Sequence, residues 1–352
     1  MSILSFDPKR WFDALPKGAI VLAAIQVALL AAPVSRLAAQ SAANDARSDG
    51  NDARADAMFA APGGTPMPLD NLFATAPGLE QQARRSQFTF NILAPIFFNS
   101  NAEAANTGGT PSAEISPIIG LSWSSPFFQS PFRISANFRA EVDRFTQASS
   151  VDFDKLAGSL RLQYVDATND QAFSPYFAYA PRMDFNATFR ERFATRHDLN
   201  LGFNKIFNFD GSFQRVPFAS NTLAATVWSF GLTSFVQRRF RDPEPSSIAF
   251  FLIPSATYVI SENWNFSLGL DFERRWFDPV QGFAQQDWFL EPIATLEFVL
   301  PSSWFGSAGN AALFGRPALD FQVAYENNWS NVQAATYNVW HVGGALKLGW
   351  RF

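Results

Sequence analysis

The sequence predicts an all-β protein, a transmembrane antiparallel up-and-down β-barrel of about twelve strands. Apolar and polar residues alternate with a period of two over segments of about ten residues, which is typical of spanning strands. The aromatic content is 16 %, with 39 Phe and 10 Trp, as a lipid-facing wall would require. The chain is 47 % hydrophobic, yet its mean hydropathy is only -0.04, which fits alternation better than long apolar blocks.

The N-terminal residues 1–39 are predicted to be a secretory signal peptide. A basic start precedes an apolar run over 18–32, and small residues follow at 38–43; the basic residues are Lys9, Arg10 and Lys17. We expect cleavage between Ala39 and Ala43. The alternative is an inner-membrane anchor, but the run is shorter than the roughly 20 residues that span a bilayer. No later stretch offers the roughly 18 consecutive apolar residues of a spanning helix.

Residues 40–85 are predicted to be a flexible periplasmic segment. Two near-identical heptads, NDARSDG and NDARADA, fill 44–57 with short polar side chains that cannot bury a core. Residues 58–85 are rich in Pro, Gly and Ala, which favours a periplasmic arm over a segment tucked into the barrel mouth.

The barrel is expected over 86–352. Its strands are predicted near 86–98, 115–125, 132–145, 154–166, 175–190, 196–208, 222–240, 247–260, 264–276, 287–300, 317–328 and 337–352. A soluble β-sandwich also alternates, but its strands usually run about five to six residues. Two connections, 209–221 and 301–316, are long for periplasmic turns, so ten or fourteen strands stay open. Tryptophans near strand ends resemble interfacial girdles: Trp123, Trp264, Trp276, Trp288 and Trp340.

The last strand carries the most specific pattern. Every second residue from Trp340 to the terminal Phe352 is apolar or glycine, whereas His341, Lys347 and Arg351 lie on the other face. A face that ends on an exposed phenylalanine is expected to meet lipid. The Gly349-Trp350-Arg351-Phe352 ending, the leader and the alternation together resemble a Gram-negative outer-membrane β-barrel.

That resemblance implies a location in outer-membrane lipid, with both termini periplasmic for an even number of strands. It also implies that the barrel-insertion machinery reads the C-terminal strand, through Leu348, Trp350 and Phe352. It does not select an activity, because barrels of this size include channels, esterases and lipases. The oligomeric state stays open.

Charged residues are predicted to line two sides of the lumen. The basic side comprises Arg133, Arg139, Lys155, Arg161, Arg182 and Arg190, with Arg196 and Lys205 beside them. Segregation is partial, because four acids are expected on the same side: Glu141, Asp143, Asp184 and Asp198. The acidic side comprises Asp271, Glu273, Glu291, Glu297, Asp320 and Glu326, with Arg275 as an exception. Facing walls of opposite charge create a transverse field that sets permeability. We therefore expect a passive diffusion channel for small polar or charged solutes. The alternative is a structural or assembly-type barrel whose charges pair and close the lumen.

Catalysis is not expected. A serine hydrolase needs a base aligned with a nucleophile, and the chain has two histidines. His197 has Leu199 two residues on, where the barrel phospholipases have a serine, and His341 is flanked on its face by Val339 and Gly343. No Gly-x-Ser-x-Gly or helical zinc motif occurs.

No cofactor or metal site is expected either, and the absence of cysteine rules out thiolate ligands. Short predicted external loops argue against an adhesin or scaffold. Removing 1–39 takes away four basic and two acidic side chains, so the net charge moves from -4 to -6, which argues against a nucleic-acid partner.

Overall fold

The computed structural model describes residues 87–107, 109–125, 131–164, 173–216, 226–280, 284–305 and 317–351. The predicted signal peptide, the predicted periplasmic segment and Phe352 lie outside the described residues. Within the described ranges, no helix is both long and apolar enough to cross a bilayer.

Strands account for most of the described chain. Their bounds are β1 (Gln87–Asn99), β2 (Ser112–Ile115), β3 (Ile118–Ser124), β4 (Phe132–Phe145), β5 (Phe153–Tyr164), β6 (Ser174–Asn186), β7 (Arg192–Phe209), β8 (Arg215–Val216), β9 (Trp228–Asp242), β10 (Ser247–Val259), β11 (Trp264–Phe277), β12 (Gln286–Val299), β13 (Ala318–Ser330) and β14 (Tyr337–Arg351). Short 3-10 helices occupy Ser149–Val151, Ser302–Phe305 and Gln333–Ala335.

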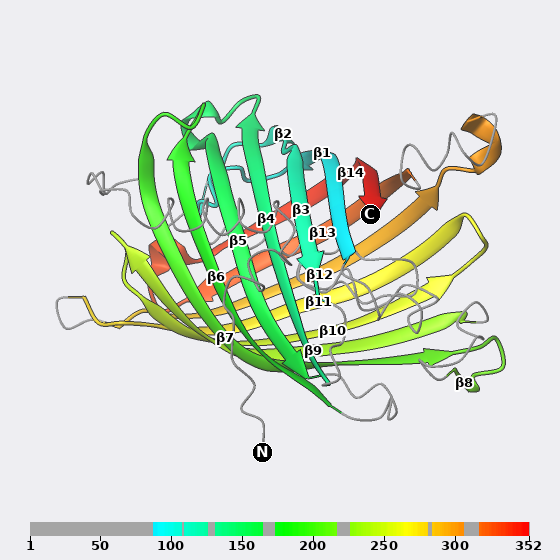
Figure 1. Ribbon diagram of the computed structural model, residues 1–352. Helices are drawn as coiled ribbons and strands as arrows, with labels where there is room; N and C mark the ends of the chain where they lie inside the picture. The colour runs from blue at the N-terminus through cyan, green and yellow to red at the C-terminus, as the bar shows by residue number, and fades with distance from the viewer. Residues whose placement is uncertain are drawn as a thin grey trace, which may run out of the picture. The chain divides into compact units, whose positions relative to one another are not determined.

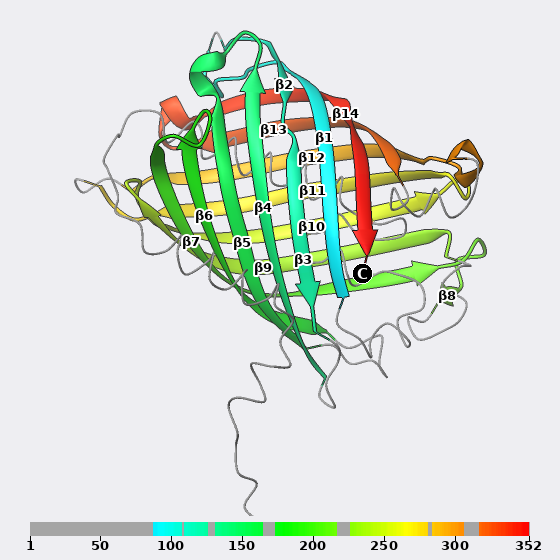
Figure 2. The same ribbon diagram turned by 45° about the horizontal axis from the view of Figure 1, so that its top comes forward.

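The described strands form one closed antiparallel barrel of twelve spanning strands (Figures 1 and 2). Both β2 and β3 pair with β1 on one side and β4 on the other, so they are two halves of one strand. The break falls at Ser116 and Pro117, where proline offers no N–H to the ladder. The two-residue β8 pairs with the end of β7. Closure comes from β14 and β1, paired from Thr89 with Arg351 to Asn99 with His341.

Every predicted strand overlaps an observed one, which confirms the count of twelve. The connection after β7 is long because the chain turns at Asp210–Gln214 and returns as β8, so β9 begins at Trp228 and not near 222. The connection after β12 opens with the 3-10 helix at Ser302–Phe305, and the remainder of 301–316 lies mostly outside the described residues.

The outer face of the barrel is apolar. On β1 the outward Ile96 and Phe98 are 58 % and 52 % exposed, while the inward Phe97 between them is 4 % exposed. Leu201, in the middle of β7, is 66 % exposed. A belt of exposed large hydrophobic side chains around a polar interior is the reverse of a soluble protein and fits a lipid-facing surface. The chain is therefore a membrane-spanning barrel.

Aromatic side chains gather on the outer face at both ends of the barrel. Where β1 begins and β14 ends, Trp264 pairs with Phe298 and Trp350 with Phe90. At the other end, Trp288 pairs with Trp329. All five of the tryptophans singled out from the sequence lie on the outer face, at the ends of their strands. Such paired rings are typical of the two membrane–water interfaces.

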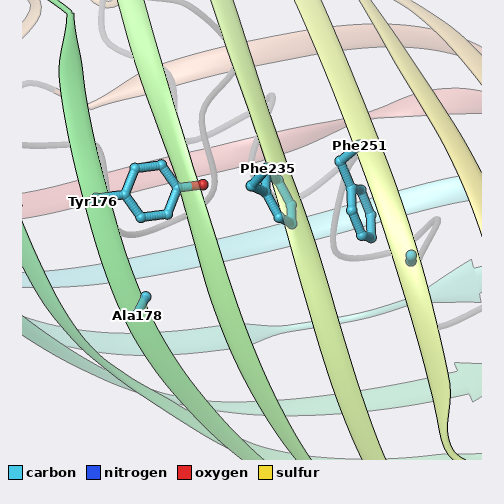
Figure 3. Close-up of a cluster of buried hydrophobic side chains, with 5 residues drawn as sticks. Tyr176, Ala178, Phe235 and Phe251 are labelled. Carbon is cyan, nitrogen blue, oxygen red and sulfur yellow. The ribbon is translucent and has the colours of Figure 1, made fainter.

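Inside the barrel, an apolar cluster interrupts the polar wall (Figure 3). Its aromatic members are Tyr176 on β6, Phe235 on β9 and Phe251 on β10. The rings of Phe235 and Phe251 stack with centroids 4.2 Å apart. Gly202 of β7 lies between Tyr176 and Phe235 in the strand register. A Cβ atom there would come within 2.3 Å of the Phe235 Cβ, so only glycine lets the two strands carry these rings side by side.

Candidate functional site in the barrel interior

The inner face carries arginine and lysine side chains over β4–β7. The structure places five of the six predicted basic residues there, together with Arg196 of β7: Arg133 and Arg139 on β4, Lys155 and Arg161 on β5, and Arg182 on β6. Arg182 lies directly opposite Arg196, and Arg196 opposite Arg241 of β9. Three guanidinium groups therefore lie on neighbouring strands at one level of the wall.

Two of the basic residues predicted inward are elsewhere. Strand β6 ends at Asn186, and Thr188 and Phe189 adopt positive φ of 74° and 53°, so Arg190 lies in an exposed turn. The apolar alternation continues as far as Phe189, which concealed the turn. Lys205 is an odd number of residues from the inward Arg196, so it faces outward, with its ammonium 5.5 Å from the centroid of the Phe207 ring.

Carboxylates on the same strands contact these cations. The Lys155 ammonium lies 2.6 Å from Glu141 of β4. Arg182 pairs with Asp184 of its own strand at 2.7 Å. Further along the wall, Asp198 contacts two guanidinium groups, those of Arg196 at 2.7 Å and Arg239 at 3.3 Å. The basic side is thus partly compensated by its own acids, as buried charges must be.

Sequence reasoning missed Arg239 and Arg241 of β9. Both belong to the inward set of that strand, opposite Asp198 and Arg196 of β7. The signal was present in the sequence, because Gln237, Arg239 and Arg241 alternate with Val236, Arg238 and Phe240.

The acidic side lies on β11, β12 and β13. All six predicted residues point inward and are at most 7 % exposed: Asp271, Glu273, Glu291, Glu297, Asp320 and Glu326. Cations also contact this side. Arg275 lies 2.5 Å from Glu273. Lys347 of β14 contacts Glu297 and is 3.7 Å from Asp320.

One group on the acidic side combines two carboxylates with an imidazole. Glu291 of β12, Glu326 of β13 and His341 of β14 are each at most 1 % exposed. One potential ligand atom from each lies within 4.8 Å of the other two. The Glu326 carboxylate accepts a hydrogen bond of 2.6 Å from the Tyr337 hydroxyl, and its second oxygen is 3.3 Å from His341 Nε2.

The two histidines lie on opposite faces of the wall. On the lipid-facing side, His197 Nδ1 lies 2.7 Å from the Tyr179 hydroxyl, and the two rings stack. His341 lies inside, beside the Glu326 carboxylate. These contacts join one imidazole to a phenol and the other to a carboxylate.

No protein-family model matches the chain, and no curated protein matches it. Among solved structures, an outer-membrane channel from Pseudomonas putida F1 is 9 % identical, with 76 % of this chain and 95 % of that chain covered and a TM-score of 0.43. The translocator domain of the autotransporter NalP from Neisseria meningitidis is 9 % identical over 89 % and 98 % of the two chains, with a TM-score of 0.41. LpxR from Salmonella typhimurium is 7 % identical over 74 % and 99 %, with a TM-score of 0.36. Identities and scores this low give no argument about activity.

Proposed function

We propose that the protein is an outer-membrane barrel of a Gram-negative bacterium and acts as a narrow passive channel for small polar or charged solutes. One observation carries the proposal: the inner face is charged, with arginines predominating on β4–β9, where acids of the same strands partly compensate them, and acids predominating on β11–β13. In a closed ring of twelve strands these two groups face each other. The resulting transverse field orients dipolar solutes and selects among ions.

The proposed location rests on the outer face. An apolar belt between two girdles of aromatic side chains fits a bilayer. Strand β1 begins at the end of the barrel where β14 ends. We assign that end to the periplasm. Leu348 and Trp350 on the outer face of β14, followed by Phe352 in the sequence, are the proposed signal to the barrel-insertion machinery.

The conduit is narrow because side chains occupy much of the interior. Arg161, Arg239 and Arg275 are inward and at most 2 % exposed. A barrel of twelve strands still encloses more space than one of eight, whose interior side chains alone can fill it. We therefore expect passage of small ions and polar solutes and exclusion of larger ones.

Single-channel recording tests this function. Purified protein, shown to be folded by heat-modifiable gel mobility, is added to a planar bilayer in salt solution. Discrete conductance steps are expected. Protein that is folded and inserted yet gives no steps would contradict the channel.

A second candidate is a structural barrel with a closed lumen. It is favoured by the same burial of inward arginines and by the cluster of Tyr176, Phe235 and Phe251. Folded, inserted and silent protein is the result that this candidate requires. We propose no catalytic activity; lipase activity that is lost in His341→Ala and kept in His197→Ala would contradict that.

A further inference from the structure

The register of three adjacent strands brings Glu291, Glu326 and His341 together. Leu290 lies opposite Asn327 and Ile293 opposite Ala324, which places Glu291 beside Glu326 on the inner face. Glu326 pairs with Val339, so His341, two residues on, is its diagonal neighbour. The three side chains are thus positioned by the strand ladder itself, which holds a site more rigidly than a loop would.

We infer that Glu291, Glu326 and His341 bind a divalent transition-metal ion inside the barrel. Carboxylate oxygen and imidazole nitrogen are the ligands that Zn²⁺, Co²⁺ and Mn²⁺ take in proteins. Donor atoms about 2.1 Å from a shared tetrahedral ion lie roughly 3.4 Å apart. Ligand atoms already within 4.8 Å of one another reach that spacing by small side-chain movements. Three protein ligands leave a fourth position for water or a solute.

Tyr337 supports this geometry. Its hydroxyl donates to Oε1 of Glu326 at 2.6 Å, while Oε2 of the same carboxylate faces His341 Nε2 at 3.3 Å. The hydrogen bond to Oε1 fixes the plane of the Glu326 carboxylate and directs Oε2 toward the ion. Partners of this kind commonly change metal affinity by about 10- to 100-fold.

The surrounding charge also favours a cation. Asp271 of β11 lies directly opposite Glu291, so buried acids occupy neighbouring positions on three strands. Like charges placed opposite each other destabilise a sheet. A bound divalent ion would offset this repulsion. Binding of the ion does not depend on whether the barrel conducts.

Calorimetric titration of ZnCl₂ into untagged, chelator-treated barrel in detergent tests the inference. One equivalent of Zn²⁺ is expected to bind, with saturation raising the unfolding midpoint because the ion binds only the folded protein. Glu291→Gln and His341→Gln are expected to abolish both effects. Tyr337→Phe is expected to weaken binding by about 10- to 100-fold while leaving one equivalent.

Two variants are matched controls. Glu297→Gln alters another buried glutamate of β12, and His197→Ala removes the histidine of the outer face; both are expected to bind Zn²⁺ as the unaltered chain does. Heat-modifiable mobility establishes that each variant is folded. Failure of the folded unaltered protein to bind, or binding that persists in both folded Glu291→Gln and His341→Gln, would overturn the site. Neither result bears on conductance, which is recorded separately.

Discussion

At Gly343 the two strands that close the barrel approach too closely for any side chain. An added Cβ atom would lie 2.1 Å from the Ile96 carbonyl oxygen and 2.7 Å from the Phe97 Cα. Gly343→Ala must therefore shift the backbone of the closing pair, which we expect to cost about 1–3 kcal/mol of unfolding free energy. Urea unfolding in lipid vesicles measures it. Gly120→Ala is the matched control, because its nearest neighbour atom would lie at 3.9 Å; equal effects of the two changes would contradict the closure described.

Lys155 and Glu141 form an ion pair that is almost completely buried. Their charged atoms lie 2.6 Å apart, and neither side chain is more than 1 % exposed. Lys155→Met leaves the carboxylate without this partner, which is expected to destabilise the barrel by about 3–5 kcal/mol. Adding Glu141→Gln to that variant is expected to recover part of the loss. A double variant no more stable than Lys155→Met would show that the two residues are not coupled.

Single residues show where sequence reasoning works and where it stops. Inward charges such as Arg161 were readable because strand alternation has a strict period of two. Arg190 was misplaced because a turn with two left-handed residues follows an uninterrupted alternating pattern. The meeting of Glu291, Glu326 and His341 was not readable, because it depends on the register among three strands, and alternation within one strand does not fix that register.

Among the strands, β7 shows most clearly how the two faces divide. Leu201, near its middle, is 66 % exposed on the lipid-facing side. An arginine facing the bilayer midplane costs about 2–4 kcal/mol, so Leu201→Arg is expected to lower the stability of the inserted barrel by that amount. Folding titrations in lipid vesicles measure the change, with Leu201→Phe as the control that keeps the face apolar. An unaffected Leu201→Arg barrel would mean that this face does not meet lipid.

The closing strand β14 is proposed to have a role beyond pairing. Its Trp350 ring already packs on Phe90 of β1, with centroids 5.5 Å apart. Removal of Phe352 alone is expected to lower the yield of assembled barrel in cells and to leave refolding into detergent unchanged, because it removes the signal and keeps the pairing. Trp350→Ala is expected to reduce both. An unchanged yield in cells after removal of Phe352 would contradict recognition of this residue.

The presence of each spanning strand could be predicted from the sequence, but the residues at which the strands begin and end were less predictable. The twelve segments followed from alternation, while the break in the second strand at Pro117 and the return of the chain as β8 did not alter the pattern enough to be read. Local backbone features of this kind add or remove one or two hydrogen bonds and leave the apolar face intact. They therefore leave little trace in the residue types.

For the whole molecule, the sequence predicted a closed barrel with an apolar outside and a charged inside, and the structure has that fold. The packing of side chains in the interior could not be predicted from the sequence. Tyr176 and Phe251 come from strands on either side of β7 and β9, and they join one cluster because Gly202 leaves room beside Phe235. Contacts across several strands decide how far side chains fill the interior, and no single segment encodes them.

We propose that the charged inner face lines a conduction path, and single cysteines on that face test this directly. The chain has no cysteine, so single cysteines report one position each. Asn200 points inward on β7, and its neighbour Leu201 points to lipid. Single-channel current is recorded while a charged, membrane-impermeant thiol reagent is added to Asn200→Cys and Leu201→Cys. If the inner face lines a conduction path, the reagent reduces the current of Asn200→Cys and leaves that of Leu201→Cys unchanged. An unchanged current through Asn200→Cys, or a block confined to Leu201→Cys, would contradict it.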